Sequence, residues 1–225
     1  MSLTLHYHPL SSFCWKVLIA LYEAETAFTP AEVNPGDPAS RAAHLVRWPL
    51  GKIPVLEDAA RGVTLPETSV IIEYLEQHHP GPRPLLPADP EARLRVRLWD
   101  RVFDLYVSQP MQKIVGDRLR PAGAQDPHGV AEARAQLRAS YALLEAEPAL
   151  DGWAAGESVT LADCAALPAL FYAAVLEPFA PEQRRLAAYF ERLVARPSVA
   201  RVLAEARPWF AWFPYRENLP ARFLG

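Results

Sequence analysis

The stretch Gly51-Lys52-Ile53-Pro54-Val55-Leu56-Glu57-Asp58, followed after a turn by Leu65-Pro66-Glu67-Thr68-Ser69, decides the fold of this 225-residue chain. Pro54 has no backbone N–H to give to a sheet, so it lies at the start or edge of an apolar strand, and its peptide bond can be cis. Glu67-Thr68-Ser69 opens a helix whose free N–H groups and positive dipole end attract a carboxylate. An extended peptide can therefore pair its backbone with Ile53 and place its terminal carboxylate at the helix start.

This combination resembles the thioredoxin-like domain in which glutathione transferases hold glutathione. The resemblance implies that Ile53, which precedes Pro54, gives main-chain hydrogen bonds to the cysteinyl part of glutathione, and that Glu67 and Thr68 hold the γ-glutamyl end. Thr68 replaces the serine that is usual in the family but keeps the hydroxyl group. Lys52 is expected near the glycyl carboxylate.

Two further side chains could assist Lys52. Arg41 and His44 both belong to the short helical stretch that is expected before Gly51. Their spacing does not choose between them, and we interpret both as solvated surface residues.

The order of elements around these motifs is that of a thioredoxin-like α/β domain. Residues 2–7 alternate polar and apolar side chains, as a half-buried strand does, and a helix follows. We assign residues 1–79 to this glutathione-binding domain, with the order β-α-β-α-β-β-α. Its later elements are a strand near 27–33, a short helix before Gly51, two strands flanking 59–62 and a helix over 67–78.

Prolines mark the end of the first domain. Residues 80–88 are predicted to be a linker, because the four prolines there cannot continue a helix or a central strand. Beyond the linker, apolar residues recur at helical spacing almost throughout, so residues 89–225 should form an all-α helical domain. Pro110, Pro121 and Pro127 are expected to break its helices.

A second motif, Gly156-Glu157-Ser158-Val159-Thr160-Leu161-Ala162-Asp163, lies in the helical domain. Thr160 and Asp163 form a capping-box pattern, with Asp in place of the usual Glu, before a helix too apolar to tolerate open N–H groups. The pattern resembles the motif that starts the central buried helix of glutathione transferases, where its role is structural. Pro168 lies within the same apolar run and should kink the helix or lie in its first turns.

The loop after the first strand carries the candidate nucleophile-activating group. It resembles the Ser-x-Phe-x-x-basic-Val pattern of the family classes with an activating serine, which aligns Ser11, Phe13 and Lys16. Thiolate, rather than thiol, attacks electrophiles, and a hydroxyl that donates to the sulfur stabilises the thiolate. Ser11 is therefore the predicted catalytic residue. Its structural alternative is a hydroxyl that caps the first helix.

Two neighbours compete with Ser11. Ser12 is the better candidate for a pure helix cap, and the pair Ser11-Ser12 is also similar to the zeta class, although Phe13 replaces the cysteine of that class. Cys14 is placed like the second cysteine of a redox C-x-x-C, but it lies on the apolar stripe of the first helix and is predicted to be buried and inert. A cysteine-type transferase or a glutathione-dependent reductase is the alternative.

The second substrate needs an apolar pocket. We expect Leu10 and Phe13 to form it together with Tyr106 and Met111 on the first helices of the second domain, although each of these is also an ordinary core candidate. The aromatic tail 209–215 either covers the site as a lid or anchors the terminus.

Composition argues against several other functions. The net charge is −3 and neither half of the chain has a basic surplus, which argues against nucleic-acid binding. The chain shows no basic segment followed by a long apolar run and no stretch of 18 apolar residues, so we expect neither secretion nor membrane spanning and favour a cytoplasmic location. Cys14 and Cys164 lie far apart and no H-E-x-x-H occurs, so no metal site is expected.

The sequence is thus identified as a member of the cytosolic glutathione transferase family, of serine type and similar to the zeta and tau classes. The resemblance implies a homodimer that uses glutathione as co-substrate, activates it as a thiolate and joins it to an apolar electrophile, with a role in detoxification. A zeta-like glutathione-dependent isomerase is the second enzymatic hypothesis. A non-catalytic glutathione- or partner-binding module is the third, because fold does not fix function.

Overall fold

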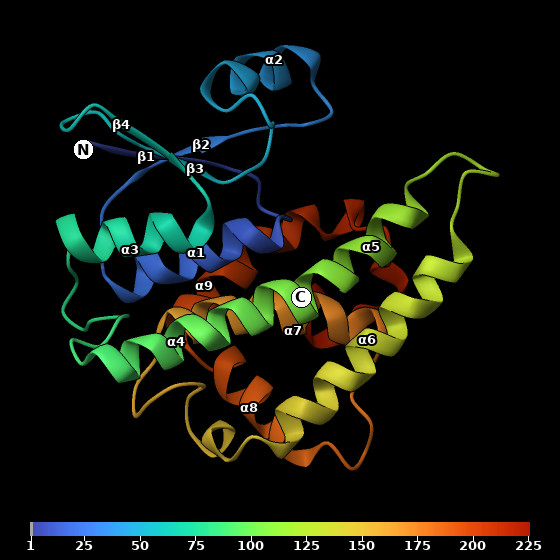
Figure 1. The fold of residues 1–225 in the computed structure, drawn as a ribbon. Helices are drawn as coiled ribbons and strands as arrows, with labels where there is room; N and C mark the ends of the chain where they lie inside the picture. The colour runs from blue at the N-terminus through green and yellow to red at the C-terminus, as the bar shows by residue number, and fades with distance from the viewer. Residues whose placement is uncertain (1) are drawn as a thin grey trace.

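The computed structural model describes residues 2–225, and it contains a sheet-bearing part and a helical part (Figure 1). The sheet has four short strands in the order β2-β1-β3-β4. β2 runs parallel to β1, whereas β3 and β4 are antiparallel to their neighbours, and Leu5 of β1 lies opposite Pro30 and Leu56. The strands are β1 (Leu3–Tyr7), β2 (Thr29–Glu32), β3 (Val55–Asp58) and β4 (Val63–Pro66).

Two helices cover the inner face of this sheet and a third lies outside it. α1 (Ser12–Glu23) and α3 (Thr68–His78) lie between the sheet and the helical part, whereas α2 (Pro38–Arg47) lies on the far side (Figure 1). α2 begins where Asp37 accepts the Ser40 N–H at 2.9 Å. The order of elements confirms the thioredoxin-like domain expected from the sequence.

The rest of the chain is helical, as predicted. The long helices are α4 (Pro90–Val102), α5 (Gln109–Arg118), α6 (Pro127–Ala146), α7 (Leu161–Leu176), α8 (Arg184–Val194) and α9 (Pro197–Ala206). A π-helical turn, η1 (Phe103–Ser108), joins α4 to α5. Shorter helical pieces are η2 (Pro148–Asp151), η3 (Arg207–Trp212), η4 (Arg216–Asn218) and α10 (Ala221–Leu224).

The break expected at Pro110 does not occur. α4, η1 and α5 continue into one another with right-handed helical backbone angles at both junctions. In the π turn, the Gln109 N–H bonds the Asp104 carbonyl five residues back, and Pro110 falls within the first turn of α5. Pro121 and Pro127 do mark the ends of helices, because α5 stops before Pro121 and α6 starts at Pro127.

α7 forms the centre of the helical part and packs against α1. Trp15 of α1 lies 5.0 Å from the ring of Phe171 and 4.9 Å from that of Tyr172. At the start of α7, the buried Asp163 carboxylate accepts hydrogen bonds from the Thr160 N–H at 2.8 Å and the Thr160 hydroxyl at 2.9 Å. It also accepts from the Ala154 N–H and the Tyr189 hydroxyl. The predicted structural role of this motif is confirmed, and Pro168 lies inside the helix.

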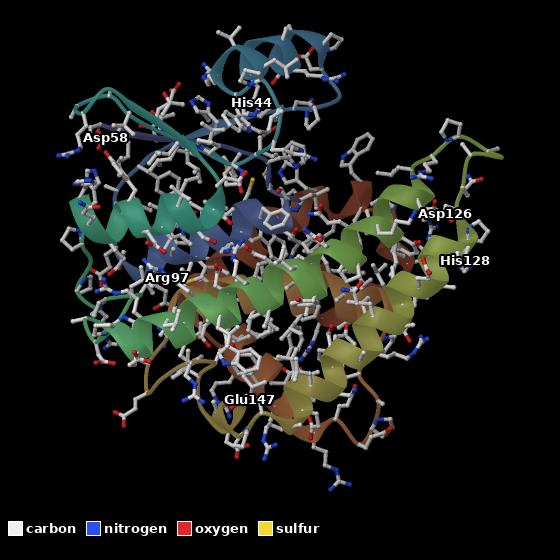
Figure 2. All side chains as sticks on the ribbon, viewed as in Figure 1. His44, Asp58, Arg97, Asp126, His128 and Glu147 are labelled. Carbon is white, nitrogen blue, oxygen red and sulfur yellow. The ribbon has the colours of Figure 1, made fainter. Side chains whose placement is uncertain are left out.

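Another buried carboxylate fixes the outer edge of the sheet-bearing part. Asp58, at the end of β3, accepts hydrogen bonds from the Tyr74 hydroxyl at 2.9 Å and from His79 at 2.8 Å (Figure 2). His78 ends α3 and His79 caps it, so this histidine pair lies at a helix C-terminus.

Two kinds of feature are absent from residues 2–225. None of their helices combines the length and the apolar character needed to cross a membrane. No group of three or more His, Cys, Asp or Glu side chains there is placed to hold a metal ion.

Candidate functional site

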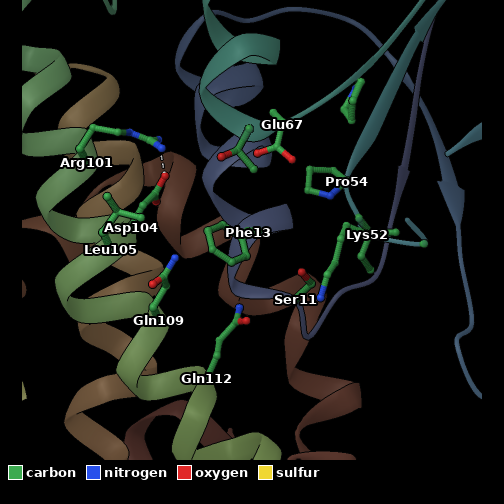
Figure 3. Close-up of a pocket in the computed structure, with 14 residues that line it drawn as sticks. Ser11, Phe13, Lys52, Pro54, Glu67, Arg101, Asp104, Leu105, Gln109 and Gln112 are labelled. Carbon is green, nitrogen blue, oxygen red and sulfur yellow. Dashed lines mark hydrogen bonds and ion pairs between the residues drawn. The ribbon is translucent and has the colours of Figure 1, made fainter. Parts of the chain in front are cut away.

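A polar cavity of about 380 Å³ lies between the two parts of the chain (Figure 3). It contains most of the residues that the sequence predicts for glutathione and also residues from α4, η1 and α5. Its lining from the first part is Ser11, Phe13, Gly51, Lys52, Ile53, Pro54, Pro66, Glu67 and Thr68, and from the second part Arg101, Asp104, Leu105, Gln109 and Gln112.

Ser11 is the N-cap of α1. Its backbone is extended, with φ −77° and ψ 119°, and its Oγ accepts the Cys14 N–H at 3.3 Å. A hydroxyl that accepts one hydrogen bond still has its own proton to donate, so the cap leaves Ser11 free to donate into the cavity. The expectation that Ser12 would be the pure cap is wrong: Ser12 is the first residue inside the helix and is 7% exposed.

Cys14 lies in the core beneath this loop. Its side chain is 0% exposed, as the apolar stripe predicted. Burial raises the pKa of the Cys14 thiol to about 12, although the Ser11 hydroxyl partly opposes the rise. A buried thiol that stays protonated at neutral pH cannot act as a nucleophile, because thiolate is the reactive form.

The segment 51–54 enters β3 in the geometry that its proline suggested. The Ile53-Pro54 peptide bond is cis, and Gly51 has a φ of +65° that a side chain would strain. His44 of α2 lies 2.9 Å, through Nε2, from the Lys52 carbonyl oxygen (Figure 2). The surface position expected for His44 is therefore wrong: its side chain is 2% exposed and holds this segment in place. Arg41 is exposed and does not line the cavity.

Glu67 and Thr68 form the opposite end of the cavity. Glu67 has a φ of +69°, a left-handed conformation that a non-glycine residue adopts at an energetic cost. α3 begins directly after it, and the Glu67 side chain makes no capping bond to the helix. The first N–H groups of α3 thus remain available to an anionic ligand.

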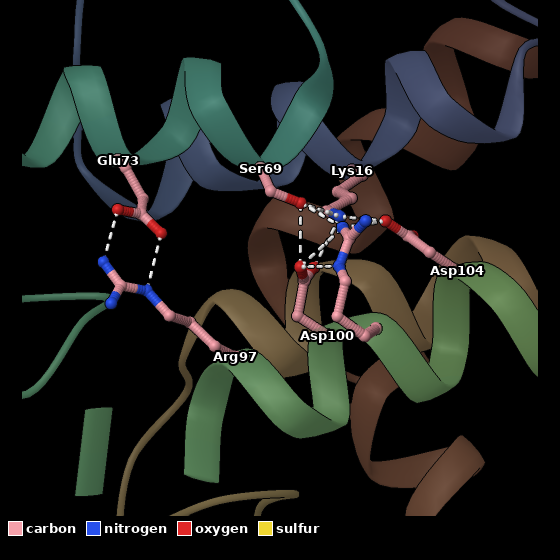
Figure 4. Close-up of polar contacts among 7 residues, drawn as sticks. Lys16, Ser69, Glu73, Arg97, Asp100 and Asp104 are labelled. Carbon is pink, nitrogen blue, oxygen red and sulfur yellow. Dashed lines mark hydrogen bonds and ion pairs between the residues drawn. The ribbon is translucent and has the colours of Figure 1, made fainter. Parts of the chain in front are cut away.

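A buried cluster of charged residues fixes the start of α3 to the second part of the chain (Figure 4). Lys16 of α1 is 1% exposed, and its Nζ lies 2.5 Å from Asp100 Oδ1 and 2.7 Å from Asp104 Oδ2. Lys16 also donates to Ser69 Oγ at 3.0 Å, and the Ser69 hydroxyl donates to Asp100 Oδ2 at 2.8 Å. The helix that carries Ser11 and the helix that follows Glu67 therefore share one ionic anchor.

Arg101 covers this cluster on the cavity side. Its guanidinium donates to Asp100 Oδ2 at 2.7 Å and to Asp104 Oδ2 at 2.6 Å, and it also contacts Ser69 Oγ. Burial raises the pKa of Asp104; the Lys16 ammonium opposes this rise, and the neighbouring Asp100 carboxylate adds to it.

The sequence analysis missed the residues that the second part contributes to the cavity. One signal was present: Asp100 and Asp104 stand four residues apart, on one helix face, in a stretch that is otherwise rich in apolar side chains. Lys16 likewise interrupts the apolar first helix. One basic and two acidic residues at core positions predict a buried ionic cluster, because burying an unpaired charge costs much free energy.

A second, apolar cavity of about 380 Å³ adjoins the first at Ser11. Leu10 and Met111 line it, as predicted, and the Tyr172 hydroxyl donates to the Leu10 carbonyl oxygen at 2.8 Å. Phe13 lines the polar cavity instead, and Tyr106 lines neither. The other lining residues are Ser12, Gln112, Val115, Gly116, Leu119, Tyr172, Trp212, Phe213 and Pro214.

The aromatic tail anchors the terminus and also contributes side chains to the wall of this cavity. Phe210 is 2% exposed and packs against Trp15 and Phe171. Trp212 is 78% exposed and stands at the cavity with Phe213. The packing of Phe210 bears out the anchoring role, and the role of the tail as a lid stays a prediction.

Comparison with known proteins identifies the family of this chain. Two family models match the chain: the N-terminal domain of glutathione S-transferases over residues 5–83 and the C-terminal domain over residues 102–197. A glutathione S-transferase of Pseudomonas putida is 35% identical over 161 residues, which are 72% of this chain and 70% of the relative. FtsZ-localized protein A of Caulobacter vibrioides is 30% identical over 231 residues, 96% of this chain and 97% of the relative.

A solved structure shows the same fold with a bound ligand. The glutathione S-transferase of Methylobacterium radiotolerans, in complex with glutathione sulfonate, superimposes with a TM-score of 0.74 at 31% identity. The match covers 89% of this chain and 93% of that one. Together with the two family models and the thioredoxin-like and helical parts, these matches confirm what the sequence motifs predicted: the chain belongs to the glutathione S-transferase family.

Proposed function

We propose that this protein activates glutathione as a thiolate and transfers it to an apolar electrophile, with Ser11 as the catalytic residue. The observation that carries the proposal is that Ser11 lines both the polar and the apolar cavity. Its Oγ accepts the Cys14 N–H, so its hydroxyl proton is available to a sulfur atom. A sulfur beside Ser11 would have this donor on one side and the electrophile on the other.

Glutathione would lie along the polar cavity. Lys52 offers a cation for the glycyl carboxylate, the Ile53 main chain pairs with the cysteinyl part, and Glu67 with Thr68 receives the γ-glutamyl end. The free N–H groups at the start of α3 favour the γ-glutamyl carboxylate. The relative from Methylobacterium radiotolerans was solved in complex with glutathione sulfonate, which supports glutathione as the ligand.

The apolar cavity favours a transferase over a zeta-like isomerase. One relative of this chain is a maleylacetoacetate isomerase of Pseudomonas aeruginosa. Maleylacetoacetate is a dicarboxylate, and a dicarboxylate needs cationic partners. No Lys, Arg or His is among the residues that line the apolar cavity in the described part of the chain. A neutral, apolar electrophile fits this lining better.

We also propose a cytoplasmic homodimer. Reduced thiols such as glutathione belong to the cytosol. Val70 of α3 and Leu94 and Leu98 of α4 are 51%, 62% and 59% exposed. The Ser69–Asp100 and Glu73–Arg97 contacts hold these two helices side by side, so the three side chains belong to one surface that a second copy could cover.

The test compares wild type with Ser11→Ala, Ser12→Ala and Cys14→Ala. Glutathione binding is measured by calorimetry, and the ultraviolet absorbance of bound thiolate is followed against pH. Ser11→Ala should raise the apparent pKa of bound glutathione and lower kcat, since it removes the donor to the sulfur, while the other two variants should leave this pKa nearly in place.

Two results would contradict the proposal. Loss of activity in Cys14→Ala, together with a mixed disulfide between wild type and glutathione, would indicate a reductase-like cysteine mechanism instead. Failure of wild type to bind glutathione would favour the partner-binding form of the non-catalytic module.

A further inference from the structure

Gln112 of α5 lies at the junction between the two cavities. Of the residues that line the polar cavity and those that line the apolar cavity, Ser11 and Gln112 are the two that belong to both sets. Figure 3 shows the Gln112 side chain extending from α5 toward the loop that carries Ser11. Any bond between a sulfur in the first cavity and an electrophile in the second forms beside these two residues.

The Gln112 carboxamide has a donor to spare. Its Nε2 donates to Ser12 Oγ at 3.4 Å, and a carboxamide nitrogen carries two hydrogens. Ser12 is itself 7% exposed at the first turn of α1, so this contact orients the carboxamide against a fixed point. The second N–H remains free at the junction.

We propose that Gln112 is a second catalytic residue, which donates a hydrogen bond to an oxygen atom of the electrophile as negative charge develops there. This inference rests on the proposed transferase function and names the substrate class. Most of the other groups that line the apolar cavity are apolar side chains, the Tyr172 hydroxyl already donates to the Leu10 carbonyl, and the Trp212 indole N–H belongs to a side chain that is 78% exposed.

The preferred substrates are then apolar electrophiles in which negative charge develops on an oxygen atom during the reaction, such as α,β-unsaturated ketones. The thiolate attacks the β-carbon, the S–C bond forms, and the π electrons of the alkene move to the carbonyl oxygen as an enolate. Gln112 stabilises that oxygen, and water then protonates the α-carbon. No oxidant or reductant is required. An alkyl halide places its developing charge on the leaving halide and gains less from the same donor.

The test uses two variants of similar side-chain length, Gln112→Met and Gln112→Glu, and a matched control, Gln136→Met. Gln136 is an exposed glutamine on α6 that lines neither cavity. Values of kcat/KM are measured with an aryl-substituted enone and with benzyl chloride. Circular dichroism and glutathione affinity check that each variant folds and binds.

We expect Gln112→Met to lose about tenfold or more with the enone and less than about threefold with benzyl chloride, because a preorganised donor in a closed oxyanion hole contributes about 10²–10³ and Gln112 is exposed, which weakens its contribution. Gln112→Glu should lose at least as much with the enone, since a carboxylate cannot donate. Gln136→Met should match wild type with both.

The outcomes separate this inference from the function on which it rests. If wild type converts both substrates and Gln112→Met loses equally with each, Gln112 only shapes the cavity and the inference is overturned while the transferase stands. If wild type binds glutathione but converts neither substrate, the transferase proposal fails and this inference fails with it. Conversion of benzyl chloride alone also overturns the inference.

Discussion

The Ser140 hydroxyl of α6 lies 2.8 Å from the main-chain carbonyl oxygen of Tyr106 in the π turn. Pro110 stands four residues after Tyr106 and has no N–H, so the usual helical bond to that carbonyl is missing. Ser140 also lies 2.9 Å from the Gln136 carbonyl oxygen of its own helix. A side chain of a neighbouring helix thus supplies the donor that the proline removes.

Ser140→Ala should lower the free energy of unfolding by about 0.5–1.5 kcal/mol, because it removes the hydrogen bond that the Tyr106 carbonyl accepts from Ser140. Pro110→Ala restores a main-chain N–H, so the cost of Ser140→Ala should be smaller in that background. Chemical denaturation of the four proteins in this double-mutant cycle measures the coupling. Equal costs in both backgrounds would show that the two residues do not compensate for one another.

Lys16→Met should destabilise the protein by about 3–5 kcal/mol, because it leaves Asp100 and Asp104 buried with Arg101 as their remaining cation. The surface pair Lys113–Asp126 provides the control, and Lys113→Met should cost at most about 1 kcal/mol.

The loss caused by Lys16→Met should also depend on pH. Burial raises the pKa of Asp104, and removal of the ammonium raises it further. A neutral Asp104 carboxyl group needs no cation, so the difference from wild type should shrink as the pH falls through the range in which Asp104 takes up a proton. Urea unfolding at several pH values measures this, and a difference that stays constant would argue against a buried ionic role for Lys16.

Glu67→Ala combined with Thr68→Ala should weaken glutathione binding, since each removes a charge-assisted hydrogen bond to the γ-glutamyl end worth about 1.5–3 kcal/mol. Titration calorimetry measures the affinity. Glutathione that lacks its γ-glutamyl residue should bind wild type and the double variant equally. An unchanged affinity for whole glutathione would show that the γ-glutamyl end does not bind at Glu67 and Thr68.

Light scattering at micromolar concentration should give a mass near twice the 25.1 kDa of one chain. Leu94→Glu with Leu98→Glu should shift the protein toward the monomer, because each places a charge in the exposed apolar surface of α4. Val46→Glu is the matched control: Val46 is 86% exposed on α2, on the other side of the sheet. A mass near that of one chain for the wild-type protein would contradict the proposed homodimer.

The sequence was most informative where one local rule determines the structure. Pro54 and the Thr160…Asp163 motif act through their own backbone neighbours, and both have the structure that was predicted. Arg101, Asp104 and Gln112 were missed because they share a cavity with Ser11 only through the tertiary packing of the two parts of the chain, and they lie about ninety to one hundred residues away in the sequence. Their spacing to Ser11 carries no local signal.

Tyr106 shows a different limit of sequence analysis. Its assignment to the second-substrate pocket assumed a regular helical period, but it lies in the π turn, which contains an extra residue and shifts the register of the faces. The wrong assignment of the helix cap to Ser12 has a different cause. Either serine satisfies the capping preference, and the hydrogen bond from the Ser11 N–H to the His8 carbonyl, at 3.0 Å, decides where the helix starts.

The ionic anchor around Lys16 limits how this protein can be recombined with its relatives. A chimaera that joins residues 2–79 to a foreign helical domain transfers Lys16 and Ser69 but leaves Asp100, Arg101 and Asp104 behind. Such a hybrid would bury a lone ammonium beside the loop that carries Ser11 unless the new partner supplies two carboxylates at the equivalent turns. The two domains can thus be exchanged only when their buried charges match. A library of domain swaps should first be filtered for carboxylates at the positions of Asp100 and Asp104.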